Sequence, residues 1–160
     1  YFTRGSGHDR FGRYTEDGDL YKDVVDRIAM KIDSAAERIP GPEIRRSEGA
    51  SVGIVTVGSC RGPVLEAIDR LAAEGVTVDY MRVRAFPFAE AVQEFLEAHD
   101  TNVVVEQNRD AQLLHLLFLE TGVAKGRLVS VRDYRGFPMT AHFVLDGVRE
   151  QLGLVPTEAG

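Results

Sequence analysis

The run Val52-Gly53-Ile54-Val55-Thr56-Val57, which ends in Gly58, decides the expected fold. Apolar and β-branched residues without polar alternation, followed by a glycine, are typical of a strand buried on both faces of a parallel sheet. Pro63 then stands at a position suited to the first turn of a helix, and Gly75 is a candidate C-cap for that helix. The stretch therefore predicts a strand, a tight turn and a helix, the first unit of an α/β fold.

The same alternation continues towards the C-terminus. Further strands are expected within residues 76–83, 102–106 and 128–131, and further helices at about 89–98, from Asp110 to Gly122, and at about 140–152. Because parallel neighbours need crossover connections, this order predicts a three-layer α/β/α domain with a mostly parallel sheet over residues 51–153. Residues 154–160 are expected to be a frayed tail.

The chain before residue 51 has a different character. Residues 1–16 are rich in glycine and arginine and show no period of a strand or helix, which indicates a loop. A helix is expected at about 19–38, with Asp17 or Asp19 as its N-cap, because apolar residues recur every four positions. Pro40-Gly41-Pro42 ends that helix, and the polar run 43–50 predicts a linker, so that residues 17–50 form a helix plus a linker.

Composition limits the classes of protein. The chain has 160 residues, 44% of them hydrophobic, and a formal net charge of −6, which is typical of a globular domain and disfavours a nucleic-acid partner. No apolar run reaches the roughly 18–20 residues of a membrane span, so no membrane partner is expected. With Cys60 as the single cysteine, a disulfide within the chain and a self-contained iron–sulfur cluster are both excluded, and a cytoplasmic location is expected. Since the chain begins with Tyr1, we expect it to be a piece of a longer polypeptide.

Two turns that follow strands carry candidate chemistry. The turn 58–63 could hold an anion on its backbone amides, and Arg61 beside Cys60 could lower a thiol pKa, but a plain strand-to-helix turn and an inert cysteine are the favoured interpretations. The run Glu106-Gln107-Asn108-Arg109 ends a strand, where ligand crevices of α/β sheets form. Helix capping together with interdomain or subunit contact is favoured there over catalysis. The histidines form no metal-binding spacing, and His99 is expected to face solvent.

The N-terminal run Arg4-Gly5-Ser6-Gly7-His8 is the other suggestive segment. Its glycines permit close backbone approach, and arginine offers a planar fork to a carboxylate or phosphate. A flexible basic linker would have the same composition, so composition alone leaves both interpretations open.

Three motifs resemble the alpha subunits of the 2-oxoacid:ferredoxin oxidoreductases, with the 2-oxoglutarate branch most similar. They are the Arg-Gly-x-Gly-His opening, the run 84–88 (RAFPF) and the block 104–112 (VVEQNRDAQ). The resemblance covers nearly the whole chain. It implies the domain that is similar to the C-terminal domain of transketolase, preceded by residues 1–16 as a linker at the edge of the active site.

The resemblance also implies a function. The complete enzyme oxidatively decarboxylates a 2-oxoacid with coenzyme A and passes electrons to ferredoxin, using thiamine diphosphate, magnesium and iron–sulfur clusters held outside this chain. Arg4 and His8 match the motif and are the candidate contacts for the 2-oxoacid or coenzyme A. We expect no catalytic or metal-ligating residue here, and a scaffold that docks on the beta subunit. The alternatives are a stand-alone flavodoxin-like or regulatory ligand-binding module, and a domain of another thiamine enzyme such as a transketolase.

Overall fold

The computed structural model describes residues 7–154, and the chain divides into two compact units between Ile39 and Pro40. The first unit contains α1 (Gly18–Asp33) and the short 3-10 helix η1 (Ser34–Glu37). The second unit contains, in order, β1 (Glu43–Arg45), β2 (Val52–Val57), η2 (Gly58–Cys60), α2 (Arg61–Ala73), β3 (Asp79–Val83), α3 (Glu90–Glu97), β4 (Thr101–Glu106), α4 (Gln112–Thr121), η3 (Lys125–Arg127), β5 (Leu128–Arg132) and α5 (Ala141–Gln151).

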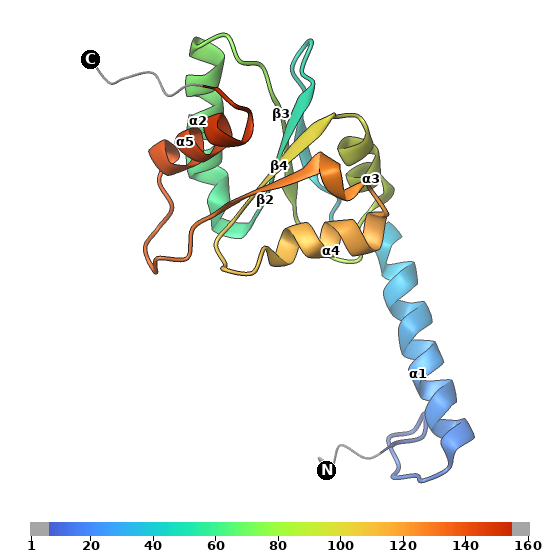
Figure 1. The fold of residues 1–160 in the computed structure, drawn as a ribbon. Helices are drawn as coiled ribbons and strands as arrows, with labels where there is room; N and C mark the ends of the chain where they lie inside the picture. The colour runs from blue at the N-terminus through green and yellow to red at the C-terminus, as the bar shows by residue number, and fades with distance from the viewer. Residues whose placement is uncertain (1–6, 155–160) are drawn as a thin grey trace. The chain divides into compact units, whose positions relative to one another are not determined.

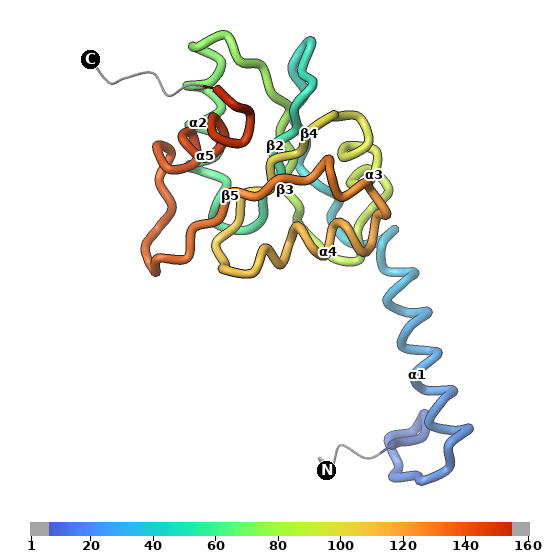
Figure 2. The backbone as a smooth tube through the Cα atoms, viewed as in Figure 1, coloured from blue at the N-terminus to red at the C-terminus, as the bar shows by residue number. Residues whose placement is uncertain are grey.

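The second unit is built on a five-stranded sheet with the order β1-β3-β2-β4-β5 (Figures 1 and 2). The strands β3, β2, β4 and β5 run parallel, and β1 pairs antiparallel with β3 at one edge. In Figure 1, α2 and α5 lie on one side of the sheet, and α3 and α4 on the other. The predicted three-layer α/β/α fold with a mostly parallel sheet is confirmed.

The central strands contribute side chains to two separate hydrophobic cores, because successive side chains of a strand point to opposite faces of the sheet. Ile54, Val103 and Val105 pack with α2 and α5, whereas Val55 and Val104 pack with α3 and α4. All five side chains are fully buried. A continuous apolar run is therefore what both faces of these strands require, as the sequence of β2 indicated.

Capping residues that the sequence predicted stand at the start of α1 and after the ends of α2 and α4. Asp17 accepts hydrogen bonds from the backbone N–H groups of Asp19 (2.9 Å) and Leu20 (3.2 Å) and caps α1. Gly75 and Gly122 follow α2 and α4 with φ of +82° and +67°, a conformation that glycine adopts without strain. Each end thus satisfies backbone groups that a helix leaves open.

The sequence predicted that the polar run 43–50 is a linker. Its first residues instead form the strand β1. Ile44 pairs with Met81 of β3, and the Glu43 carboxylate binds the Arg61 guanidinium through two hydrogen bonds of 2.9 and 3.0 Å. This ion pair holds the pKa of Glu43 at about 2. Three residues of which two are charged give no strand signal, and a charged edge strand is also a common protection against unwanted pairing.

Gly53 allows β2, β4 and α3 to approach one another closely. A Cβ atom at this position would lie 2.6 Å from the Asn102 side-chain oxygen and 2.7 Å from a ring carbon of Phe95. Asn102 is fully buried and donates to the Leu96 carbonyl at 2.9 Å, so it cannot simply turn aside. The contact therefore requires the absence of a side chain at residue 53.

We predict that Gly53→Ala lowers the free energy of unfolding by about 1–3 kcal/mol, because overpacking displaces buried neighbours. Chemical denaturation monitored by circular dichroism measures the change. Gly62→Ala is the matched control, since a Cβ there meets no atom within 4 Å and alanine suits the helix interior of α2. Equal stability of the two variants would contradict the packing argument.

Candidate functional site

The carboxyl ends of the four parallel strands form one edge of the sheet. The chain moves from β2 to β3 on one side and then to β4 on the other, so the order of strands reverses between β2 and β4. Ligands of open α/β sheets bind at such a reversal. Ser59, just after β2, donates a hydrogen bond of 2.8 Å to the side-chain oxygen of Gln107, just after β4. This hydrogen bond connects the two loops that follow β2 and β4.

A hollow of about 690 Å³ lies at the same edge. Ser59 and Pro63 line it from the turn into α2, Gln107 lines it from the end of β4, and residues of the loop 133–139 form the remaining wall. The Gln107 amide also donates to the Phe137 carbonyl at 3.3 Å. The hollow is therefore bounded by three connected loops rather than by one.

The buried side chain of Glu106, at the end of β4, holds the turn into α4 in place through hydrogen bonds. Its carboxylate has no exposed surface and accepts hydrogen bonds from the backbone N–H groups of Leu113 (2.8 Å) and Leu114 (3.2 Å) at the start of α4. The Asn108 amide donates to the same carboxylate. The sequence proposed Asp110 as the cap of this helix, which is wrong, because the Asp110 carboxylate instead pairs with the exposed Arg109 guanidinium.

The four residues predicted for subunit contact are thus divided between the interior and the surface. Glu106 is buried, Asn108 accepts the backbone N–H groups of Asp110 and Gln112 at 3.1 Å, and Gln107 and Arg109 are exposed. Arg132 donates to the Arg109 carbonyl at 2.7 Å and links this turn to β5. Whether the block contacts another subunit stays a prediction.

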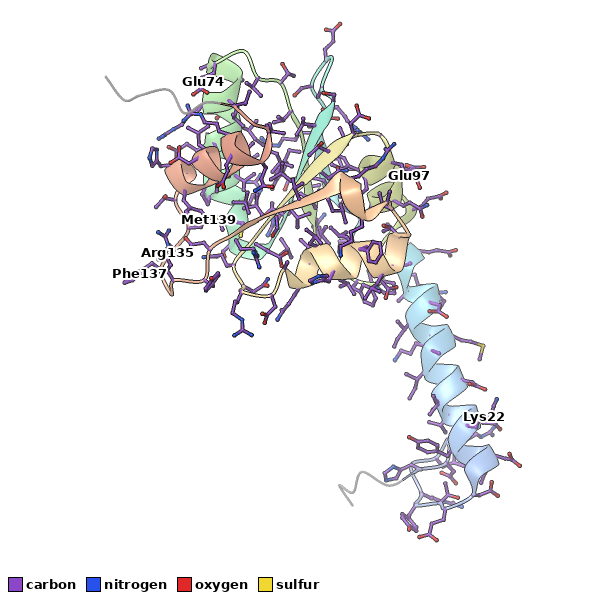
Figure 3. The ribbon with its side chains drawn as sticks, viewed as in Figure 1. Lys22, Glu74, Glu97, Arg135, Phe137 and Met139 are labelled. Carbon is purple, nitrogen blue, oxygen red and sulfur yellow. The ribbon has the colours of Figure 1, made fainter. Side chains whose placement is uncertain are left out.

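The loop after β5 supplies functional candidates that the sequence analysis missed. Tyr134 and Phe137 are 62% and 77% exposed, which is unusual for aromatic side chains, and Figure 3 shows Phe137 on this loop together with Arg135 and Met139. Buried Asp133 binds the Arg135 guanidinium at 2.9 Å, and this pairing lowers the pKa of Asp133. The loop sequence, with two aromatic residues, glycine and proline between a strand and a helix, carried a signal that could have been used.

Cys60 is a structural residue in this arrangement. Its side chain is 2% exposed, and burial raises the pKa of the thiol. Arg61 is occupied by Glu43 and does not activate it. The inert interpretation of this cysteine is the one the structure supports, since a reactive thiolate needs a lowered pKa and solvent access.

The N-terminal candidates are only partly described, since Arg4 lies outside residues 7–154. His8 pairs with Tyr14 across a tight turn, in which the Asp9 carboxylate accepts the backbone N–H groups of Phe11 and Arg13, both at 2.9 Å. These hydrogen bonds lower the pKa of Asp9. The described part of this segment is therefore an ordered turn rather than a plain linker.

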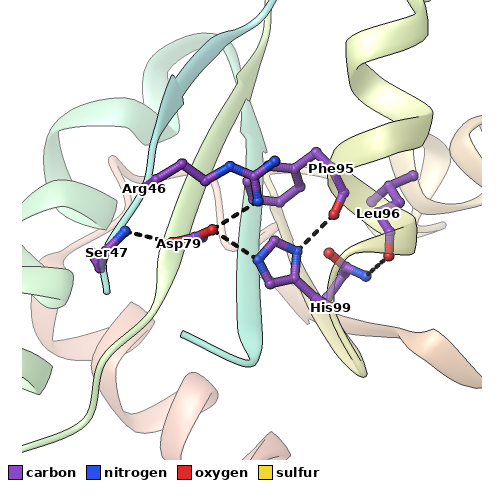
Figure 4. Close-up of polar contacts among 7 residues, drawn as sticks. Arg46, Ser47, Asp79, Phe95, Leu96 and His99 are labelled. Atoms are coloured by element: carbon purple, nitrogen blue, oxygen red, sulfur yellow. Dashed lines mark hydrogen bonds and ion pairs between the residues drawn. The ribbon is translucent and has the colours of Figure 1, made fainter. Parts of the chain in front are cut away.

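The expectation that His99 faces solvent is wrong. The ring is 1% exposed and lies between the Phe95 carbonyl (2.7 Å) and the Asp79 carboxylate (3.0 Å), as Figure 4 shows. Asp79 also accepts hydrogen bonds from the Ser47 backbone N–H (2.7 Å) and the Arg46 guanidinium (2.9 Å). Both ring nitrogens therefore lie against oxygen atoms of the chain itself.

This His99–Asp79 pair has the form of a catalytic dyad, but it is closed off from solvent, and its hydrogen-bond partners are the Arg46 guanidinium, the Ser47 backbone N–H and the Phe95 carbonyl. Burial raises the pKa of Asp79, yet the hydrogen bonds from Ser47, Arg46 and His99 outweigh burial and hold it below its ordinary value. The pair is best understood as a polar connection between β1, β3 and the end of α3. An exposed pair of His142 and Asp146 (3.1 Å), which the sequence analysis also missed, lies on α5.

Within residues 7–154, no group of three or more histidine, cysteine, aspartate or glutamate side chains is arranged to hold a metal ion. The helices of the same range include none with the length and apolar character of a membrane span.

Comparisons with known proteins agree with the motifs. The chain matches no protein-family model. It is 33% identical over 153 residues to the alpha subunit of 2-oxoacid:ferredoxin oxidoreductase 2 of Aeropyrum pernix, a match that covers 92% of this chain and 24% of the relative. It is 25% identical over 150 residues to the corresponding alpha subunit of Saccharolobus solfataricus, covering 91% and 23%. The chain thus spans about a quarter of the length of these curated relatives.

Solved structures show the same relationship. The 2-oxoglutarate:ferredoxin oxidoreductase of Magnetococcus marinus, solved with 2-oxoglutarate, coenzyme A and succinyl-CoA bound, matches with a TM-score of 0.78 and 28% identity, over 95% of this chain and 27% of that chain. A split-gene transketolase shares the fold, with a TM-score of 0.56 and 23% identity over 70% of this chain and 42% of that chain. The resemblance to these alpha subunits and the transketolase-like fold are confirmed.

We predict that Asp79→Asn lowers the free energy of unfolding at pH 7 by about 3 kcal/mol, because it removes the charge that Arg46 and His99 face and sets an amide N–H group against their donors. Because the pKa of Asp79 is lowered by folding, its stabilisation is present above the ordinary carboxyl pKa near 4 and is lost as the pH falls through the folded-state pKa. Urea unfolding from pH 2 to 7 measures both effects.

The variant should therefore lose less stability than the original protein between pH 4 and 2. Asp110→Asn serves as the control, since that carboxylate is exposed and should change stability by no more than about 0.5 kcal/mol. If the free energy of unfolding of Asp79→Asn fell between pH 4 and 2 as steeply as that of the original protein, Asp79 would not be a source of the pH dependence.

Proposed function

We propose that this chain, similar over nearly its whole length to the alpha subunits of 2-oxoacid:ferredoxin oxidoreductases, is part of such a subunit. The complete enzyme would oxidatively decarboxylate a 2-oxoacid to an acyl-CoA and pass the electrons to ferredoxin. The match to the Magnetococcus marinus enzyme supports 2-oxoglutarate as the first substrate to test. A cytoplasmic location agrees with the single, buried cysteine.

Within that enzyme we assign the chain a scaffold role. The observation that carries this role is the carboxyl edge of the sheet, where exposed Tyr134 and Phe137 stand beside Gln107 over loops fixed by a buried carboxylate. Exposed aromatic side chains held by rigid elements are the typical anchors of protein interfaces. We propose the beta subunit as the protein that docks here, with Asn108 and Arg109 at the rim, and ferredoxin as a partner of the complex.

Arg4 and His8 remain our candidates for contact with the 2-oxoacid or coenzyme A. The proposal rests on their match to the Arg-Gly-x-Gly-His motif. The arginine fork suits a carboxylate or a phosphate, both of which these substrates carry. The ordered turn that follows His8 supports a fixed rather than a random path for this segment.

The cofactors of the complete enzyme do not fit this chain. Iron–sulfur clusters require about four cysteine thiolates, and the sequence has one cysteine. Asp17-Gly18-Asp19 is not the Gly-Asp-Gly start of a magnesium–thiamine diphosphate motif, and Asp17 is used as a helix cap. We therefore propose that thiamine diphosphate, magnesium and the clusters are held by other parts of the enzyme.

A flavodoxin-like or regulatory ligand-binding module is the second candidate, favoured by the hollow at the strand reversal. Three of its polar side chains, however, are paired within the chain, because Ser59 binds Gln107 and Asp133 binds Arg135. A small-molecule site usually leaves a few polar groups free to fix its ligand. Subunit docking therefore accounts for the edge better than ligand binding does.

We predict that Phe137→Asp in the full-length alpha subunit weakens association with the beta subunit by on the order of tenfold or more, since an interface anchor would become a charge. The Phe137 side chain is 77% exposed, so the fold of the domain should not change. Sedimentation of the mixed subunits measures association, and 2-oxoacid-dependent reduction of ferredoxin measures the activity of the assembled enzyme.

Leu119→Asp is the matched control, because Leu119 is 72% exposed on α4 and lies outside the carboxyl-edge loops. It should leave association and activity unchanged. Normal assembly of Phe137→Asp would refute the docking role, and the absence of 2-oxoacid-dependent ferredoxin reduction by the unmodified complex would refute the proposed enzyme.

A further inference from the structure

The first unit of the chain exposes an apolar helix face. Of the fourteen large hydrophobic side chains that are exposed within residues 7–154, eight lie between Phe11 and Ile32. None of the 16 residues of α1 is buried. In the second unit, by contrast, the sheet and its four helices enclose two cores. More than half of the exposed large hydrophobic side chains therefore belong to the first unit, and six of them lie on α1.

Six residues define what we call the apolar face of α1: Leu20, Tyr21, Val24, Val25, Ile28 and Ile32. At about 100° per residue they fall within an arc of about 140° around the helix. An arc of this width is typical of a helix that packs on the core of a globular protein, whereas a coiled-coil seam is narrower. Met30 lies on the opposite side, among charged residues.

This helix needs tertiary contacts for its stability. Isolated helices shorter than about 12–15 residues are marginal in water, and α1, with 16 residues, is only just longer. The β-branched residues Val25, Ile28 and Ile32 lower its helix propensity further. The Asp17 cap contributes only about 1 kcal/mol by ordinary magnitudes. The face must therefore be covered in the functional protein.

The size of the face indicates what covers it. A stable interface between separate proteins takes roughly 20–30 residues from each side, whereas this face has six. Contact within one polypeptide does not bear the entropy cost of association, so a small face is sufficient there. Because the related alpha subunits are about four times as long as this chain, such a polypeptide has ample surface to supply.

We infer that the apolar face of α1 is covered, in the complete alpha subunit, by an apolar surface from another part of the same polypeptide. The inference rests on the proposed function only for the existence of that longer subunit. Arg27 lies just outside one border of the face and Lys31 just inside the same border, and neither has an ion-pair partner among the residues that the structure describes. The covering surface should accordingly carry acidic side chains along this border.

Amide hydrogen exchange tests the inference in the unmodified proteins. Amides of residues 24–32 should exchange on the order of tenfold or more slowly in the full-length alpha subunit than in the 160-residue chain. Equal exchange in the two proteins would overturn the inference. Slow exchange already present in the short chain would also overturn it, whether it rises with concentration alongside a sedimenting dimer or is independent of concentration.

Two substitutions in the full-length subunit locate the contact. Ile28→Asp, at the centre of the face, should abolish the extra protection, and Met30→Asp, on the opposite side, should preserve it. The same effect from both would overturn the inference. Ferredoxin reduction by the same preparation reports separately on the proposed function, because protection without activity removes the enzyme but leaves the helix contact in place.

Discussion

The carboxylate of Glu106, buried where β4 ends, is the interaction on which the edge of this domain depends. It accepts two backbone N–H groups at the start of α4 and the Asn108 amide, while the Glu106 carbonyl accepts the Asp133 backbone N–H at 3.2 Å. A negative charge at a helix N-terminus is favoured by the helix dipole, and a buried charge is tolerated only when it is fully hydrogen-bonded. One residue thus fixes both the turn into α4 and the loop after β5, which together present Gln107 and Phe137.

The fold could be predicted from the sequence because its central strands are buried on both faces and leave a continuous apolar signature, as in residues 103–105. The polar contacts between elements could not be predicted from the sequence. His99 follows a helix end and looks like a surface residue, but its ring is buried and bonds Asp79, twenty positions earlier in the chain. Likewise β1 is recognisable only from its pairing with β3. Such features depend on contacts distant in sequence, which residue periodicity does not encode.

The candidate site shows the same division. The block from Glu106 to Arg109 was correctly placed at a strand end, but its first member serves the interior and its fourth faces solvent. The aromatic residues after β5 were missed because no periodic pattern marks a loop. Two surfaces of the described residues stand out: the carboxyl edge of the sheet in the second unit and the apolar helix face in the first. Both are compatible with the scaffold role that we propose.

The most direct test of this account is the stability of Glu106→Ala measured by urea unfolding, beside Gln107→Ala as the control. Loss of the carboxylate leaves buried amide donors without an acceptor, so we expect the free energy of unfolding to fall by about 3 kcal/mol. Gln107→Ala removes only exposed hydrogen bonds and should cost well under about 1 kcal/mol. If Glu106→Ala were as stable as the control, the buried carboxylate would not be what holds this edge together.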